Sequence, residues 1–165
     1  MASHLAARST TAPRVTLWAR DAAQAHAMAA GRRNERYLPA AVLPANVHVT
    51  DDLAGASQCD VLLAAVPVAA LPALLDALDA ADRRPPLLSL AKGFVDGAGA
   101  GPLIHQLLAQ RWSAPVGVIS GPSFADEVAQ GLPTALTVAA TTAELAAAVV
   151  MLLRGDTLRA YVTPD

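Results

Sequence analysis

The sequence alternates short apolar runs, which have the character of buried strands, with segments that have a helical pattern. Strands that alternate with helices in this way are typical of a mostly parallel sheet with helices on its faces. The expected strands are Arg14–Trp18, Asn46–Thr50, Asp60–Val66, Leu87–Leu90, Val116–Ser120, Thr134–Ala139 and Leu158–Val162. The expected helices are Ala2–Arg8, Ala22–Gly31, Ala69–Ala80, Gly101–Arg111, Phe124–Gln130 and Thr142–Leu153. Together they predict an α/β fold with a doubly wound, mainly parallel sheet.

Length and composition agree with one domain. The chain has 165 residues, of which 54% are hydrophobic and only 4% aromatic, so the core is built mostly from Ala, Leu and Val. No linker or repeat divides the sequence. The formal net charge is −2, and the longest basic runs are the pairs Arg32-Arg33 and Arg83-Arg84. This balance argues against a nucleic-acid partner and leaves small anionic ligands open.

Three further features indicate where the protein works. The longest apolar stretch, residues 61–75, is interrupted by Pro67 and Pro72 and is shorter than the roughly 20 residues that cross a bilayer. The N-terminal residues do not have the pattern of a secretory signal. Cys59 is the single cysteine and cannot form an internal disulfide. We therefore expect a cytoplasmic protein with no membrane partner and, because the histidines lack metal-ligand spacing, no metal site.

Two helices begin with the spacing of a capping box. Thr141-x-x-Glu144 precedes the last helix, and Ser123-x-x-Asp126 precedes the helix 124–130. In the second case the box predicts that the Ser123 hydroxyl bonds the amide of Asp126. That structural role competes with any role of Ser123 in binding, and from the residues alone it is the simpler one.

The strand at residues 14–18 is followed directly by Arg20 and Asp21. In a dinucleotide-binding fold this position contacts the adenosine ribose, where a carboxylate bonds the 2′-hydroxyl of NAD and an arginine accommodates the 2′-phosphate of NADP. Arg20 thus favours NADP, and Asp21 leaves NAD open. Taken alone, both residues are equally explained as solvated side chains at the end of a strand.

Five motifs occur in the order and at the spacing of one family. They are VTLWARD at 15–21, NERYLP at 34–39, AVP at 65–67, AKG at 91–93 and SGPSFADEVAQGLPTA at 120–135. With them the sequence resembles the bacterial NAD(P)-dependent glycerol-3-phosphate dehydrogenases. The resemblance implies a Rossmann-like fold, with residues 1–165 as an NAD(P)-binding domain truncated at both ends. It also implies NAD(P)H-dependent reduction of dihydroxyacetone phosphate to sn-glycerol 3-phosphate for glycerophospholipid synthesis.

The resemblance assigns roles to the residues that match the motifs. The implied cofactor contacts, to NADP or NAD, are Arg20, Asp21, Tyr37, Lys92 and Ala125. The implied contacts to the small-molecule substrate are Lys92, Gly121 and Ser123. An ammonium after a buried strand can reach a phosphate or a developing alkoxide, although a lysine at such a place is more often simply exposed.

The sequence also departs from the family. It contains no GxGxxG turn, so the first strand and its glycine-rich turn are expected before Met1. The strands at 14–18 and 60–66 are then expected to expose unpaired edges. The lysine that acts as general acid and base is expected in a helical domain after Asp165, so no catalytic residue is assigned here.

Two alternatives to this function remain open. One is a non-catalytic truncated remnant of this enzyme, and another is a different small-substrate reductase such as ketopantoate reductase. The sequence also leaves open whether the full-length parent is a homodimer.

Overall fold

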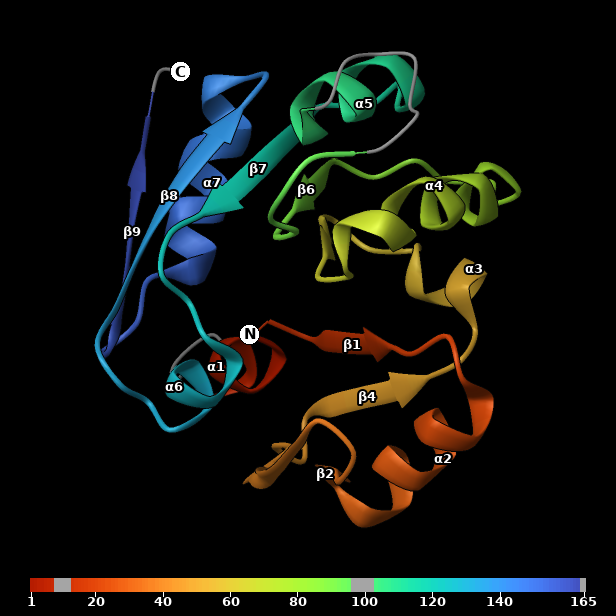
Figure 1. Ribbon diagram of the computed structural model, residues 1–165, viewed down its shortest axis with the longest axis vertical. Coiled ribbons are helices and arrows are strands. Elements are labelled where there is room, and N and C mark those ends of the chain that lie inside the picture. Colours follow the sequence, from red (N-terminus) through yellow and green to blue (C-terminus); the bar gives the residue numbers. More distant parts are fainter. Residues whose placement is uncertain (8–12, 96–102, 164–165) are drawn as a thin grey trace.

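The computed structural model describes residues 1–7, 13–95 and 103–163, in which strands and helices alternate along the chain (Figure 1). The strands are β1 (Val15–Trp18), β2 (Arg33–Asn34), β3 (Leu38–Val42), β4 (Val47–Thr50), β5 (Leu62–Ala64), β6 (Leu87–Ser89), β7 (Val116–Ser120), β8 (Thr134–Ala140) and β9 (Leu158–Val162). The helices are α1 (Ala2–Ala6), α2 (Ala22–Gly31), α3 (Leu53–Ala56), a 3-10 helix (Val68–Ala70), α4 (Leu71–Asp79), α5 (Ile104–Arg111), α6 (Ala125–Ala129) and α7 (Ala143–Leu153).

All the expected strands and helices are present, with small differences at their ends. The expected helix ends at Arg8 and Gly101 lie outside the described residues. The sequence reasoning missed β2, β3 and α3. The strand β2 is too short to show an alternation of apolar and polar residues. The strand β3 contains Pro39, and a proline within an apolar run argues against a strand. The helix α3 is a single turn capped by Asp52, whose side chain accepts a hydrogen bond from the amide of Gly55.

The strands form three separate ladders. A five-stranded sheet has the order β5-β6-β7-β8-β9 and is parallel except between β7 and β8. The strands β1 and β4 form a parallel pair, and β2 and β3 form an antiparallel hairpin. The mixed α/β fold with a mostly parallel sheet is thus confirmed.

Helices cover both faces of the five-stranded sheet. Neighbouring residues of β6 point to opposite faces: Leu87 packs in the cluster with α4 and α5, and Leu88 packs in the cluster with α7. Both leucines are fully buried. A strand enclosed on both faces in this way reads in the sequence as a continuous apolar run, as Leu87-Leu88 does. A third, smaller cluster joins α2 to β4.

The contact between α4 and α5 is reinforced at the surface. Arg111 donates hydrogen bonds to Asp76 at 2.5 Å and to Asp79 at 3.4 Å. The pKa of the Asp79 carboxyl is lowered by the hydrogen bond from Arg84 and by Arg111. The Trp112 indole donates to the carbonyl of Pro85 at 2.8 Å, with Arg84 over its ring. These exposed ion pairs add little stability. The buried indole bond fixes the chain that leads into β6.

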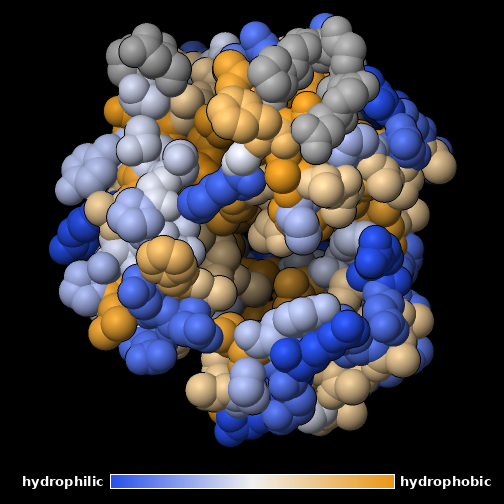
Figure 2. All heavy atoms as spheres, viewed as in Figure 1, coloured by the Kyte–Doolittle hydropathy of each residue, from blue (hydrophilic) through white to orange (hydrophobic). Residues whose placement is uncertain are grey.

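The strands β1 and β5 are each paired on one side only within the described residues. Among the described strands, β1 pairs with β4 alone and β5 pairs with β6 alone, as the sequence analysis expects. Leu62 and Leu63 of β5 are half-buried, whereas Leu87 and Leu88 on the next strand are fully buried. Figure 2 shows a hollow between the β1–β4 pair and the five-stranded sheet, with apolar residues deep inside it. We call this space the central hollow.

The helix caps differ from expectation at both positions. The cap of α7 is Thr142, whose side chain accepts from the amide of Leu145 at 3.2 Å. Thr141 instead bonds the backbone of Val116 at the start of β7. At α6 the expected capping box is absent: the helix begins after Phe124 with no side-chain cap. The hydroxyl of Ser123 is therefore available for other contacts.

The unpaired edges predict self-association of the chain Met1–Asp165, since free strand edges invite pairing with other copies. We expect Thr16→Lys on β1 to lower this self-association, because a lysine on an edge strand blocks edge pairing. The matched control is Thr137→Lys on β8, a strand that is paired on both sides. Sedimentation velocity would measure both variants. An equal effect of the two lysines would contradict the role of the β1 edge.

Candidate functional site

The first group of predicted site residues lies at the carboxyl ends of β6 and β7. In a parallel sheet the loops that follow neighbouring strands meet at the same edge, which is where ligands bind in open α/β folds. Lys92 follows β6, and Gly121 and Ser123 follow β7. Because β6 and β7 are hydrogen-bonded neighbours, the two loops are brought together.

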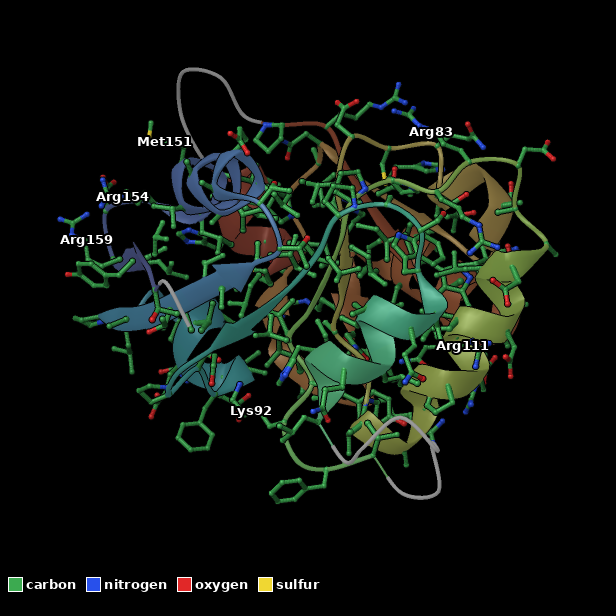
Figure 3. The ribbon with its side chains drawn as sticks, turned by 90° about the horizontal axis from the view of Figure 1, so that it is seen from above. Arg83, Lys92, Arg111, Met151, Arg154 and Arg159 are labelled. Atoms are coloured by element: carbon green, nitrogen blue, oxygen red, sulfur yellow. The ribbon has the colours of Figure 1, made fainter. Side chains whose placement is uncertain are left out.

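Lys92, the only lysine of the sequence, is presented by a fixed turn. Ser89 at the end of β6 is fully buried, and its hydroxyl accepts a hydrogen bond from the amide of Ala91 at 3.1 Å. Gly93 then has φ +111°, a backbone conformation that favours glycine. The side chain of Lys92 is exposed, and its ammonium donates to the Ser123 hydroxyl at 3.3 Å (Figure 3). The two loops are thus linked through a cation and a hydroxyl.

Gly121 leaves no room for a side chain beside this pair. It has φ +133°, and a Cβ atom there would lie 2.7 Å from the carbonyl oxygen of Ala135. The Ser123 hydroxyl approaches the carbonyl of Gly121 at 3.5 Å. The loop after β7 therefore needs glycine at position 121, both for its positive φ and for its close packing against β8.

The helix that follows this loop does not itself attract anions. Ala125 is the exposed first residue of α6, and Asp126 and Glu127 occupy its first turn. Their negative charges oppose an anion on the helix axis. The positive charge of the site comes from Lys92 instead. This charge is suited to a phosphate or to a polarised carbonyl oxygen beside Gly121 and Ser123.

The second group of predicted residues lies at the start of α2. Asp21 is the N-cap, and its carboxylate accepts from the amide of Gln24 at 3.2 Å. The preceding indole of Trp18 donates to the carbonyl of Asp51 and joins the carboxyl ends of β1 and β4. Arg20 is exposed, and no hydrogen bond or ion pair to another described residue involves its guanidinium.

Tyr37 is joined to this second group through residues that the sequence reasoning did not single out. The side chain of Asn34 accepts from the amide of Tyr37 and from the side chain of Gln24, each at 3.2 Å. The exposed ring of Tyr37 carries the guanidinium of Arg36 at 5.1 Å from its centroid. Asparagine is common in turns, so the position of Asn34 three residues before Tyr37 could have indicated this hydrogen bond.

The structure thus forms two groups rather than one. Lys92, Gly121 and Ser123 follow β6 and β7 of the five-stranded sheet, whereas Ala125 begins α6, which contacts β3. Arg20, Asp21 and Tyr37 lie beside the β1–β4 pair. The central hollow separates these two parts of the molecule (Figure 2).

Other candidate chemistry is limited. Burial raises the pKa of the Cys59 thiol, which keeps it protonated and weakly nucleophilic. Within residues 1–7, 13–95 and 103–163, no three His, Cys, Asp or Glu side chains are grouped to hold a metal ion. No helix among these residues is long and apolar enough to span a membrane.

Known proteins resemble this chain over most of its length. The family model for the N-terminus of NAD-dependent glycerol-3-phosphate dehydrogenase matches residues 1–146. A glycerol-3-phosphate dehydrogenase (NAD(P)+) from Nitrosococcus oceani is 44% identical over 155 residues, which cover 90% of this chain and 44% of the relative. One from Acidovorax ebreus is 44% identical and covers 92% of this chain and 46% of the relative. The chain therefore spans less than half the length of these relatives.

Solved structures agree with the sequence matches. The crystal structure of glycerol-3-phosphate dehydrogenase from Coxiella burnetii superposes with a TM-score of 0.83 at 29% identity, covering 92% of this chain and 47% of that one. A structure from Dunaliella salina, at 22% identity and a TM-score of 0.82, shares the fold.

The backbone at Gly121 yields a stability prediction. We expect Gly121→Ala to lower the free energy of unfolding by about 1–3 kcal/mol through backbone strain. The clash between the new Cβ and the carbonyl oxygen of Ala135 adds to this loss. Gly131→Ala is the matched control, because Gly131 also has a positive φ, +73°, but has no atom within 4 Å of the added Cβ. Urea unfolding would compare the two. Equal losses would show that the close approach at Gly121 is unimportant.

Proposed function

Since the chain belongs to the NAD-dependent glycerol-3-phosphate dehydrogenase family, we propose that it forms the cofactor-binding part of an enzyme that reduces dihydroxyacetone phosphate to sn-glycerol 3-phosphate with NADPH or NADH. The observation that carries the proposal is the contact between Lys92 and Ser123 beside Gly121. A cation and a neighbouring hydroxyl provide the charge and the hydrogen bonding that a small phosphorylated ketone needs for binding.

Lys92 has the central role in this proposal. Its exposed ammonium holds the substrate and draws electron density toward the carbonyl oxygen, where negative charge grows during reduction. Ser123 orients the ammonium through their 3.3 Å contact and can donate to a substrate oxygen. The reduced nicotinamide, when bound, supplies the hydride. The proton donor is proposed to be a lysine outside this sequence, so the described residues bind and polarise.

The second group is proposed to hold the adenosine end of the cofactor. Arg20 would meet the 2′-phosphate of NADP, and Asp21 or Tyr37 would contact the ribose. Ala125 would approach the cofactor from α6. Arg20 fits this purpose because its exposed guanidinium makes no hydrogen bond or ion pair with another described residue.

The setting of the enzyme belongs to the same proposal. We place it in the cytoplasm, in line with the single Cys59. The product is a precursor of glycerophospholipids. The division into a dinucleotide-binding domain, residues 1–165, and a helical substrate domain stays a prediction, as does a homodimer of the complete protein.

The role of Lys92 predicts a loss of turnover. In the complete gene product, Lys92→Ala should lower kcat by about a hundredfold or more, the order of loss expected when one electrostatic stabiliser is removed. The control is Arg83→Ala, another exposed cation, which lies far from Lys92 in Figure 3. Oxidation of NADPH by dihydroxyacetone phosphate would measure both. Near-normal turnover of Lys92→Ala would remove Lys92 from the site.

The role of Arg20 predicts a change in cofactor preference. Arg20→Ala should weaken NADPH binding by about 1.5–3 kcal/mol, the contribution of a charge-assisted hydrogen bond, and should change NADH binding far less. Steady-state kinetics with each cofactor would separate the two effects. Equal losses for NADPH and NADH would refute a contact with the 2′-phosphate.

A further inference from the structure

A continuous chain of hydrogen bonds connects the start of α2 to the turn of the β2–β3 hairpin. Asp21 accepts from the Gln24 amide, the Gln24 side chain donates to Asn34, and Asn34 accepts from the Tyr37 amide, all at 3.2 Å. The turn at residues 35–37 is therefore fixed beside the first turn of α2. Arg36 lies in this turn, two residues from Asn34.

The guanidinium of Arg36 is uncommitted. Arg32 bonds the carbonyls of Val47 and Pro44, and Arg33 bonds the carbonyl of Pro39. Arg36 has no hydrogen bond or ion pair to another described residue. Arg20, which directly precedes the N-cap Asp21, likewise makes no hydrogen bond or ion pair with another described residue. Two exposed arginines that make no such contact are thus connected to the start of α2, one through the chain and one through the hydrogen-bonded turn.

The ring of Tyr37 determines how Arg36 is held. The guanidinium lies 5.1 Å from the ring centroid, a distance at which the ring face attracts a cation. A guanidinium attracted to a ring face in this way can still donate its N–H groups to a ligand. A planar fork that is oriented in advance loses less entropy when it binds a phosphate than a freely rotating side chain would.

We propose that Arg36 is a second specificity-determining arginine for the 2′-phosphate of the cofactor, held there by Tyr37 and positioned by Asn34. This inference rests on the proposed function, because it deepens the adenosine site assigned to Arg20. Asp21 and Glu35 oppose the phosphate with two carboxylates. The carboxylate of Asp21 is engaged by the helix cap, and the second arginine balances the charge of Glu35. Two cations then face one phosphate.

The test compares two small probes on the complete gene product by calorimetry. One is 2′,5′-ADP, and the other is 5′-AMP, which lacks only the 2′-phosphate. Arg36→Ala should lower the affinity for 2′,5′-ADP about tenfold or more and change that for 5′-AMP by less than about twofold. Arg36→Lys should recover only part of the loss, because an ammonium lacks the planar fork.

Arg33→Ala is the matched control, because it removes the same charge from the same hairpin. The guanidinium of Arg33 donates a hydrogen bond to the carbonyl of Pro39. This variant should leave the ratio of the two affinities unchanged. Asn34→Ala keeps the charge and should lower the affinity for 2′,5′-ADP more than that for 5′-AMP. A loss confined to Arg36→Ala, without any effect of Asn34→Ala, would overturn the positioning role.

The outcomes separate this inference from the proposed function. Binding of both probes with equal losses in Arg36→Ala and Arg33→Ala would overturn the inference alone. Tighter binding of 5′-AMP than of 2′,5′-ADP by the unaltered protein would do the same and would leave an NAD-dependent enzyme. Failure of both probes to bind would overturn the adenosine site of the proposed function, and the inference with it.

Discussion

Enclosure of β6 on both faces is the constraint on which the substrate end of the site depends. A central parallel strand has hydrogen-bonded neighbours on both sides and helices above and below. Leu87 and Leu88 meet these conditions between α4, α5 and α7. The strand therefore ends at a fixed position, and buried Ser89 fixes the turn that follows it. The place of Lys92 is set by packing several residues away from its own exposed side chain.

Much of this arrangement is predictable because its signals are local in the sequence. Apolar runs locate β5, β6 and β7, and the motifs after them indicate Lys92, Gly121 and Ser123. The contact between Lys92 and Ser123 depends on strand order, which no local pattern contains. The capping box at Ser123 was a wrong prediction for a related reason. Its spacing fits a cap, but α6 starts at Ala125, and the hydroxyl contacts Lys92 and Gly121 instead.

The residues proposed to hold the adenosine end of the cofactor are likewise only partly predictable from the sequence. The positions of Arg20 and Asp21 follow from the end of a strand, so sequence alone suffices to suggest them. Two polar side chains, Gln24 and Asn34, connect Asp21 to Tyr37 through hydrogen bonds. Both residues lie close to Asp21 in the sequence. Their hydrogen bonds depend on how the hairpin folds back on α2. The hairpin was missed because β2 is short and β3 contains Pro39.

The central hollow has a mechanical consequence. A continuous strand ladder would carry displacement directly from one end of the molecule to the other, but here the β1–β4 pair and the five-stranded sheet have separate ladders. They meet through helices and loops, with α1 against β1 and α6, and α6 against β3. Such contacts can slide or hinge at small cost in backbone pairing. Among the described residues, no strand ladder therefore fixes the separation between the segment that carries Arg20 and the loop that carries Lys92, and the packing of helices and loops determines it.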